Sequence, residues 1–166
     1  ISIIDGQPSL RRRFVDDTVS CIDQEYRKRL RNYENALRRR NKILEKESDQ
    51  SKLKEELAFW NNYLIEQAEY IVEKRRWLCS EIESGTAIVT HNFSLEYVEN
   101  VISKARFEEY FMREYYQKRT LIGIQRDDFR VSVSYPKRKS IDVHVYASRG
   151  EQRLALFWLI VNQLGI

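Results

Sequence analysis

The sequence is poor in the residues that make loops, cross-links and membrane spans. Its 166 residues include only five glycines, two prolines and two cysteines. The glycines are too scattered to build the loop G-x-x-x-x-G-K-[ST], so this stretch contains no phosphate loop of that type. The two cysteines, Cys21 and Cys79, fit a reducing cytosolic compartment, and their spacing is not that of a metal site.

No apolar run is long enough to cross a membrane and no signal peptide is visible, so we expect a cytoplasmic protein without a membrane partner. The composition, 42% hydrophobic and 33% charged, is typical of a globular protein. A net charge of +4 permits a nucleic-acid partner without requiring one. The chain lacks an initiator Met and both of its ends are apolar. We therefore interpret it as a fragment of a longer protein, with further motifs outside this sequence.

Apolar residues with a period near 3.5 recur through the first half of the chain. We expect Asp23 to begin a long helix, Glu47–Ser51 to interrupt the pattern, and a second helix to continue it to about Glu83. A short polar break between two such helices favours an antiparallel hairpin, either in an ordinary bundle or as a coiled coil. Arg40 falls at the one skipped position of the first stripe. The stripes are Tyr26, Leu30, Tyr33, Leu37 and Leu44, then Leu53, Leu57, Trp60, Leu64, Gln67, Ile71, Lys74 and Leu78.

Shorter elements flank this hairpin. Before it, the sequence predicts a buried strand at Ile1–Ile4 and a helix capped by Ser9. After it, we expect strands at 93–101, 129–135 and 141–147, the last two as a hairpin, a helix at 104–118 and an all-round apolar, buried helix at 154–164. The expected fold class is therefore α+β, mostly helical. Its expected divisions are a leading segment 1–22, a helical hairpin lobe 23–84 and a return to the core at 85–166.

The stretch "SRGEQR", Ser148–Arg153, opens the last helix directly after a predicted strand. Ser148 and Glu151 have the spacing of a capping box, in which each side chain satisfies a backbone N–H of the other residue. Phosphate binding is a second interpretation, because such a helix N-terminus presents free N–H groups and a positive dipole end. Gly150 favours the second interpretation, since glycine weakens a first helical turn and suits a close approach to the backbone. Both interpretations stay open on these residues alone.

The longer segment "YASRGEQRLAL" resembles the signature motif of the ABC-type ATPases of DNA repair and chromosome maintenance, in the form found in the RecF family. Ser148, Gly150, Glu151, Gln152 and Arg153 match this pattern position by position, whereas Arg149 occupies a place that varies among RecF proteins. Three further blocks resemble RecF in the same order. They are "IIDGQPSLRRRFVDD", "YENALRRRNKIL" and "RTLIGIQRDDFRV".

The last of these blocks matches imperfectly. RecF proteins have Pro and His where this sequence has Ile124 and Gln125, so the role of that His does not carry over. The residues that do match, without an assigned role, are Gly123, Arg126, Asp127 and Asp128.

The resemblance implies part of an ABC-type nucleotide-binding core into which the helical hairpin is inserted. The longer protein would bind DNA at gaps or single-strand/double-strand junctions, bind ATP and Mg²⁺, form an ATP-dependent homodimer and hydrolyse ATP slowly. It would act with recombination mediator proteins in replication, recombinational repair and the SOS response. Ser148–Arg153 would contact, in trans, the γ-phosphate held by the other protomer. The fragment alone would bind no cofactor and have no ATPase activity.

Basic runs occur at Arg11–Arg13, Arg38–Arg40, Lys74–Arg76 and Lys137–Lys139. Acidic residues are interleaved with most of them, which favours solvated helix faces. Contact with the DNA backbone is the alternative, because it needs only spaced positive charge. The candidates for that contact are Arg11, Arg12, Arg13, Lys137, Arg138 and Lys139.

Three other functions stay open. One is a related SMC-like repair or chromosome-structure ATPase, and another is a non-enzymatic helical adaptor whose "SRGE" is only a cap. The third is a metal-dependent nuclease, because Asp142 and His144 alternate on a predicted strand near Asp127 and Asp128 and could hold Mg²⁺ or Mn²⁺. A solvated strand face explains Asp142 and His144 more simply, so we expect no metal site.

Overall fold

The computed structural model describes residues 2–88, 91–135 and 139–166, and its fold is α+β and mostly helical, as the sequence predicted. The helices are α1 (Ser2–Asp5), α2 (Pro8–Ile22), α3 (Gln24–Lys46), α4 (Gln50–Ser84), α5 (Lys104–Gln117), the 3₁₀ helix η1 (Ile124–Arg126), α6 (Val143–Tyr146) and α7 (Arg149–Leu164). The strands are β1 (Asn92–Val98), β2 (Asp128–Ser134) and β3 (Ile141–Asp142). None of the described helices has the length and apolar character needed to cross a membrane.

The chain folds into two compact units. The sheet unit consists of Ile1–Ile22, Lys74–Val98 and Asp127–Ile166, and the helical unit of Asp23–Glu73 and Glu99–Arg126. The sequence predicted consecutive segments, whereas each unit combines stretches that are far apart along the chain.

The ends of α3 and α4 are fixed by capping side chains. The Asp23 carboxylate accepts a hydrogen bond from the Tyr26 N–H at 2.9 Å and caps α3. Asp49 accepts from the Ser51 N–H at 2.8 Å at the start of α4. The polar turn between the helices therefore lies where the sequence predicted it.

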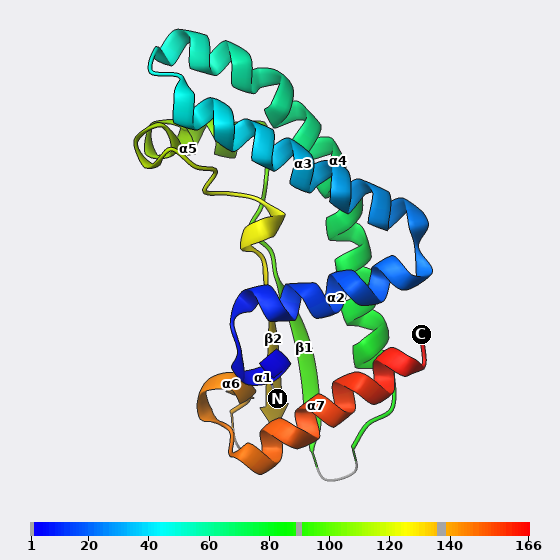
Figure 1. The fold of residues 1–166 in the computed structure, drawn as a ribbon. Coiled ribbons are helices and arrows are strands. Elements are labelled where there is room, and N and C mark those ends of the chain that lie inside the picture. The colour runs from blue at the N-terminus through cyan, green and yellow to red at the C-terminus, as the bar shows by residue number, and fades with distance from the viewer. Residues whose placement is uncertain (1, 89–90, 136–138) are drawn as a thin grey trace. The chain divides into compact units, whose positions relative to one another are not determined.

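α3 and α4 pair antiparallel within the helical unit, and Figure 1 shows them side by side. Near the start of α3, Asp23 accepts a hydrogen bond from the Tyr70 hydroxyl at 2.8 Å. Nearer the turn, the Arg40 Nε donates to Asn61 Oδ1 at 2.8 Å. Contacts that advance along α3 thus move back along α4, which confirms the predicted hairpin.

The end of this hairpin is packed against α5. Phe111 of α5 joins Leu44, Leu53 and Leu57 in one buried apolar cluster. The Ser103 hydroxyl caps α5 by accepting from the Arg106 N–H at 3.2 Å. The expected helix at 104–118 is therefore present and belongs to the helical unit.

An antiparallel sheet with the order β1-β2-β3 forms the centre of the sheet unit. β1 and β2 pair over seven residues, with Phe93 opposite Val133 and Leu95 opposite Val131. These four side chains are buried, and the Phe93 ring centroid lies 5.7 Å from that of Trp158 on α7. Strands were thus expected correctly at β1 and β2, although β1 ends at Val98 rather than at Val101.

Two predictions for the N-terminal region are wrong. The segment expected as a strand at Ile1–Ile4 is helical from Ser2 onward, as α1. A short apolar run does not distinguish a buried strand from a buried helical turn. Both would bury Ile4, which is buried here. Ser9 lies inside α2 rather than before it, because the helix begins at Pro8, whose fixed φ suits a first helical position.

Two predictions for the C-terminal region also need correction. The strand expected at 141–147 ends after Asp142, whose carboxylate accepts from the His144 N–H at 2.8 Å and caps the short helix α6. The last helix is not buried all round, since Phe157 is 60% and Leu164 79% exposed. One side of α7, which includes Trp158, is packed against the rest of the sheet unit.

Candidate functional site

The signature segment forms the N-terminus of α7 in the sheet unit. Ser148 is the N-cap residue, and its hydroxyl accepts from the Glu151 N–H at 3.3 Å. Glu151 reaches back, because its Oε2 accepts from the Ser148 N–H at 2.6 Å. The other carboxylate oxygen of Glu151 accepts from the Tyr135 hydroxyl. The capping box that the sequence allowed is therefore formed, and together with Tyr135 it engages both carboxylate oxygens of Glu151, the one acid in the segment.

The rest of the segment faces solvent. Ser148, Arg149, Gly150 and Arg153 are exposed, and Gln152 is half-buried with its Nε2 donating to the Val143 carbonyl at 3.3 Å. Among the described residues, none accepts a hydrogen bond from the backbone N–H of Arg149 or Gly150. These are two of the donors that every helix leaves unsatisfied at its start. The arrangement offers N–H groups, a hydroxyl and two guanidinium groups to an anion from outside.

Gly150 is not required by the fold of this chain. A Cβ added there would meet only the Ser148 hydroxyl oxygen, at 3.8 Å, and the backbone is not in the left-handed region. Alanine would also favour the helix by roughly 0.5–1 kcal/mol. The missing side chain therefore leaves open space at the helix start, as a site for close approach of a phosphate would need.

Asp127 is fully buried within the sheet unit. It accepts from Arg75 Nη1 at 2.6 Å and from the Tyr97 hydroxyl. Arg75 is itself 2% exposed and donates from Nε and Nη2, at 2.9 Å each, to the two oxygens of Asp16. Burial, followed by the Asp127 charge, raises the pKa of Tyr97, so the phenol stays protonated and keeps donating. Asp127 therefore holds together α4, β1 and the start of β2.

Asp128 has a separate partner on α2. It accepts from Arg11 Nε at 2.7 Å and from Arg11 Nη2 at 2.9 Å, and Arg11 Nη1 donates to the Gly6 carbonyl at 2.7 Å. Burial by itself would raise the pKa of Asp128, but the hydrogen bond from Arg11 and that from the Phe129 N–H outweigh it and the pKa is lowered. Next to it, Arg12 donates to the Asp127 carbonyl at 2.6 Å, and burial lowers the pKa of Arg12.

Gly123 and Arg126 of the same motif belong to the helical unit. Gly123 has a φ of 111°, and a Cβ there would collide with the Tyr33 hydroxyl, so this position requires glycine. Gln125, which departs from the family pattern, accepts from the Tyr33 hydroxyl at 2.6 Å and donates to the Ile122 carbonyl at 2.7 Å. Arg126 is exposed. The block "RTLIGIQ" is thus fastened to α3 by Tyr33.

A second buried arginine centres the helical unit, and sequence reasoning missed it. Arg40, 1% exposed, donates to Asn61, to the Thr120 hydroxyl at 2.8 Å and to Glu114 Oε2 at 2.6 Å. Burial lowers the pKa of Arg40, while the Glu114 charge opposes that change. The position of Arg40 in the apolar stripe of α3 was the available signal, because a side chain at that position faces the interior.

The candidate DNA-binding residues do not form one free basic surface. Arg11 and Arg12 are committed to Asp128 and to the Asp127 carbonyl, whereas Arg13 is exposed and pairs with Asp17 one turn on at 3.4 Å. Lys139 is exposed. The remaining candidates, Lys137 and Arg138, lie outside the described residues.

The residues considered for a nuclease site do not form one. Asp127 forms a buried ion pair with Arg75. Asp142 caps α6 and pairs with Arg130 at 3.3 Å. His144 Nδ1 lies 3.1 Å from the Ile4 carbonyl. His144 lies on the helix α6, so the strand on which this hypothesis depended is not present at His144. The described residues contain no group of three potential metal ligands.

The free thiol of Cys79 is buried, which raises its pKa to about 12, and it is therefore unreactive.

The sequence of the chain was compared with those of known proteins. No family model matches the chain. It is 27% identical to the DNA replication and repair protein RecF of Natranaerobius thermophilus over 99% of its own length, and 27% identical to that of Agathobacter rectalis over 100%. The chain is therefore similar to RecF proteins along its whole length. It spans about half the length of these curated relatives, 48% and 47% respectively.

The fold agrees with this conclusion. A solved structure of the recombination mediator protein RecF-ATPrS in the RecFOR pathway superimposes on 99% of the RecF-like chain and has a TM-score of 0.86. The two are 22% identical, and the chain corresponds to 48% of that structure. The resemblance that four sequence blocks indicated is thus confirmed along the whole chain.

Proposed function

We propose that this chain belongs to a DNA repair protein that dimerises around ATP, and that its signature segment contacts the nucleotide of the other protomer. Ser148 and the N–H groups of Arg149 and Gly150 would donate to the γ-phosphate. Arg153, one helical turn further, would add a positive charge. ATP with Mg²⁺ would supply the triphosphate that contacts both protomers in the closed dimer.

The observation that carries this proposal is the open space at Gly150. Glycine there weakens α7, relieves no strain and avoids no collision within this chain. The residues present therefore fit a phosphate that approaches from outside, and the RecF-like sequence and fold provide the reason for it to be there. The dipole of the 16-residue helix α7 favours an anion at the same end.

An aspartate substitution separates this proposal from a cap without further function. Asp caps a helix about as well as Ser, so Ser148→Asp should leave thermal stability nearly unchanged. Its carboxylate would repel a γ-phosphate, so the longer protein should lose ATP-dependent dimerisation in analytical ultracentrifugation. Normal ATP-dependent dimerisation of Ser148→Asp would contradict the proposal and leave "SRGE" as a cap.

Two further variants complete the experiment. Ser148→Arg removes the cap and fills the space at the helix start, so it should abolish dimerisation and lower stability by ~1 kcal/mol. Nucleotide binding by the monomer should persist in both Ser148 variants, because the signature contacts the partner's nucleotide. Gln163→Asp, near the other end of α7, is the matched control for an added carboxylate and should dimerise like the parent.

We further propose that the longer protein binds DNA, a role that the exposed basic residues support only in part. Arg13 and Lys139 are exposed, while Arg11 and Arg12 are engaged inside the sheet unit. Arg13→Ala and Lys139→Ala should therefore reduce the salt dependence of binding to gapped DNA without loss of stability. Unchanged salt dependence in the double variant would place DNA contact elsewhere.

The helical adaptor is the second candidate function, because the capping box is fully formed. It predicts that every Ser148 variant that preserves the cap behaves like the parent in all assays. The Ser148→Asp experiment therefore decides between the two candidates.

A further inference from the structure

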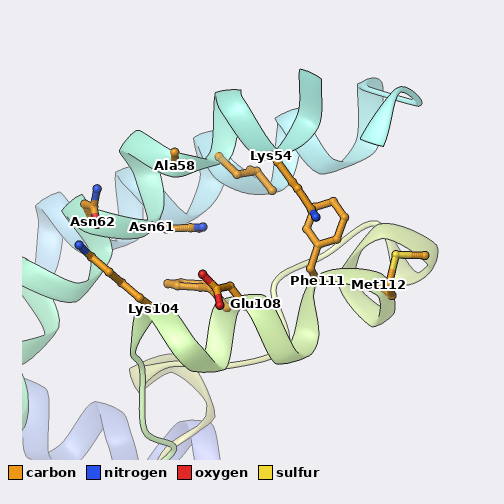
Figure 2. Close-up of a pocket in the computed structure, with 10 residues that line it drawn as sticks. Lys54, Ala58, Asn61, Asn62, Lys104, Glu108, Phe111 and Met112 are labelled. Carbon is orange, nitrogen blue, oxygen red and sulfur yellow. The ribbon is translucent and has the colours of Figure 1, made fainter. Parts of the chain in front are cut away.

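A cavity of about 600 Å³ lies between α4 and α5, inside the helical unit (Figure 2). Leu57 and Ala58 line it from α4, and Phe107, Phe111 and Met112 line it from α5. Leu57 and both phenylalanines are buried, whereas Ala58 and Met112 are exposed. The cavity therefore has an apolar floor and an open rim, and its volume suits two bulky apolar side chains. We call it the α4–α5 groove.

The floor of this groove is held in place by the buried Arg40. The Arg40 guanidinium lies 4.5 Å from the centroid of the Phe107 ring and donates to Asn61 Oδ1. Because Arg40 occupies the amide oxygen, Asn61 presents its NH₂ group as the remaining donor at the groove. The groove is thus preorganised, which lowers the entropy cost of binding.

Two lysines mark opposite ends of the groove. Lys54 lies over the Phe111 ring, with its Nζ 4.9 Å from the centroid, and Figure 2 shows Lys104 pointing toward Asn62 at the other end. Within the described residues, neither lysine takes part in an ion pair. Glu108 is the single acid among the described residues that line the groove. The ends of the groove therefore favour negative charge.

The spacing of these features defines the shape of an occupant. Lys104 and Phe111 are seven residues apart on α5, which corresponds to about 10 Å or two helical turns. An α-helix with carboxylates at positions i and i+7 would reach both lysines. Apolar residues at i+3 and i+4 of the same face would enter the cavity between them.

We propose that the α4–α5 groove binds an acidic amphipathic helix of a partner protein. Two of its apolar side chains fill the cavity and a carboxylate pairs with each of Lys54 and Lys104. Nucleic acid fits the groove less well, because the floor is apolar, the positive charges are only two, and Glu108 lies between them.

A displayed library of random 16-residue peptides tests this proposal with the 166-residue chain as bait. Selection on the parent, with counter-selection on Ala58→Trp, should enrich acids at i and i+7 around apolar residues at i+3 and i+4. Ala58 is exposed, so Trp fills the groove from its rim without entering the core. Circular dichroism checks that the variant is folded. Failure to enrich this pattern would overturn the proposal.

Charge reversal provides an independent readout on an enriched peptide. Lys54→Glu with Lys104→Glu should weaken its binding by at least about tenfold, and exchange of the two peptide acids for lysines should restore binding to that variant. Lys52→Glu, an exposed neighbour outside the groove, should have little effect. Equal losses from Lys52→Glu and Lys54→Glu would overturn the proposal. A third outcome would also overturn the proposal. In it, no peptide is selected, and an oligo-dT ligand binds the parent but does not bind Ala58→Trp.

Discussion

The Arg-Asp-Asp block and the signature segment are both polar and both reach into the sheet unit, yet the fold uses them in opposite ways. Asp127 is 0% exposed and bonds to side chains 30 and 52 residues away in sequence. Ser148 is exposed, and its hydroxyl caps only its own helix. The Arg-Asp-Asp block stabilises the fold through Asp127, whereas the signature segment leaves backbone N–H donors available at the start of α7.

This difference extends to the other family blocks. Tyr33 and Arg40 of "YENALRRRNKIL" bond to Gln125 and Thr120 of "RTLIGIQRDDFRV" inside the helical unit. Arg11 and Asp16 of the first block bond to Asp128 and Arg75 inside the sheet unit. Three of the four blocks are therefore partners in structural networks. The fourth block instead presents Ser148, Gly150 and Arg153 to solvent.

The largest effect should come from the buried side of this comparison. Arg75→Met leaves Asp127 and Asp16 without their guanidinium partner, so we expect a loss of ~3–5 kcal/mol in the free energy of unfolding measured with urea. Arg13→Met breaks only the exposed pair with Asp17 and should cost about 0.5 kcal/mol or less. Similar losses in the two variants would show that the Asp127 network is not structural.

A glycine comparison should give the next largest effect. Gly123→Ala forces a side chain into a left-handed backbone and against the Tyr33 hydroxyl, so we expect a loss of ~1–3 kcal/mol or more. Gly165→Ala meets only the Asn162 carbonyl oxygen, at an ordinary 3.5 Å, and should change stability little. Thermal unfolding of the two variants measures the difference. An equally stable Gly123→Ala would contradict the strained turn.

Acid should act on the Arg11–Asp128 pair in a defined pH range. The folded pKa of Asp128 is lowered, so its contribution is fully present above the unfolded value of about 3.9 and is lost as pH falls through the folded pKa. The stability difference between the parent and Asp128→Asn should therefore be constant above about pH 5 and shrink below pH 4. A difference that stays constant down to pH 3 would contradict the lowered pKa.

Local chemistry allowed much of the fold to be predicted from the sequence. The apolar stripes and the capping residues Asp23 and Ser148 act over a few residues, so α3, α4 and the start of α7 were correctly expected. The prediction of a strand at 141–147 was wrong. Alternation over so few residues did not outweigh the helix cap at Asp142, after which α6 begins.

The networks could not be predicted in the same way. Arg11 and Asp128 are 117 residues apart, and Arg40 and Glu114 are 74 apart, so no local pattern joins them. Arg40 was treated as a gap in the stripe, although its place on the inward face of α3 indicated burial. The family resemblance identified the residues of these blocks, but only the fold shows which of them are bonded to one another.

The contrast between the buried Asp127 network and the exposed start of α7 is tested most directly at Gly150. The account predicts that Gly150→Ala leaves the chain as stable as the parent, or more stable by up to ~1 kcal/mol, because the added Cβ meets open space and alanine favours the helix. In the same preparation of the longer protein, ATP-dependent dimerisation should weaken by about tenfold or more, since the methyl group occupies the approach to the backbone N–H. Gly165→Ala, at the opposite end of α7, should dimerise normally. A Gly150→Ala protein that dimerises with ATP as tightly as the parent would contradict the central claim that this helix start is a phosphate contact.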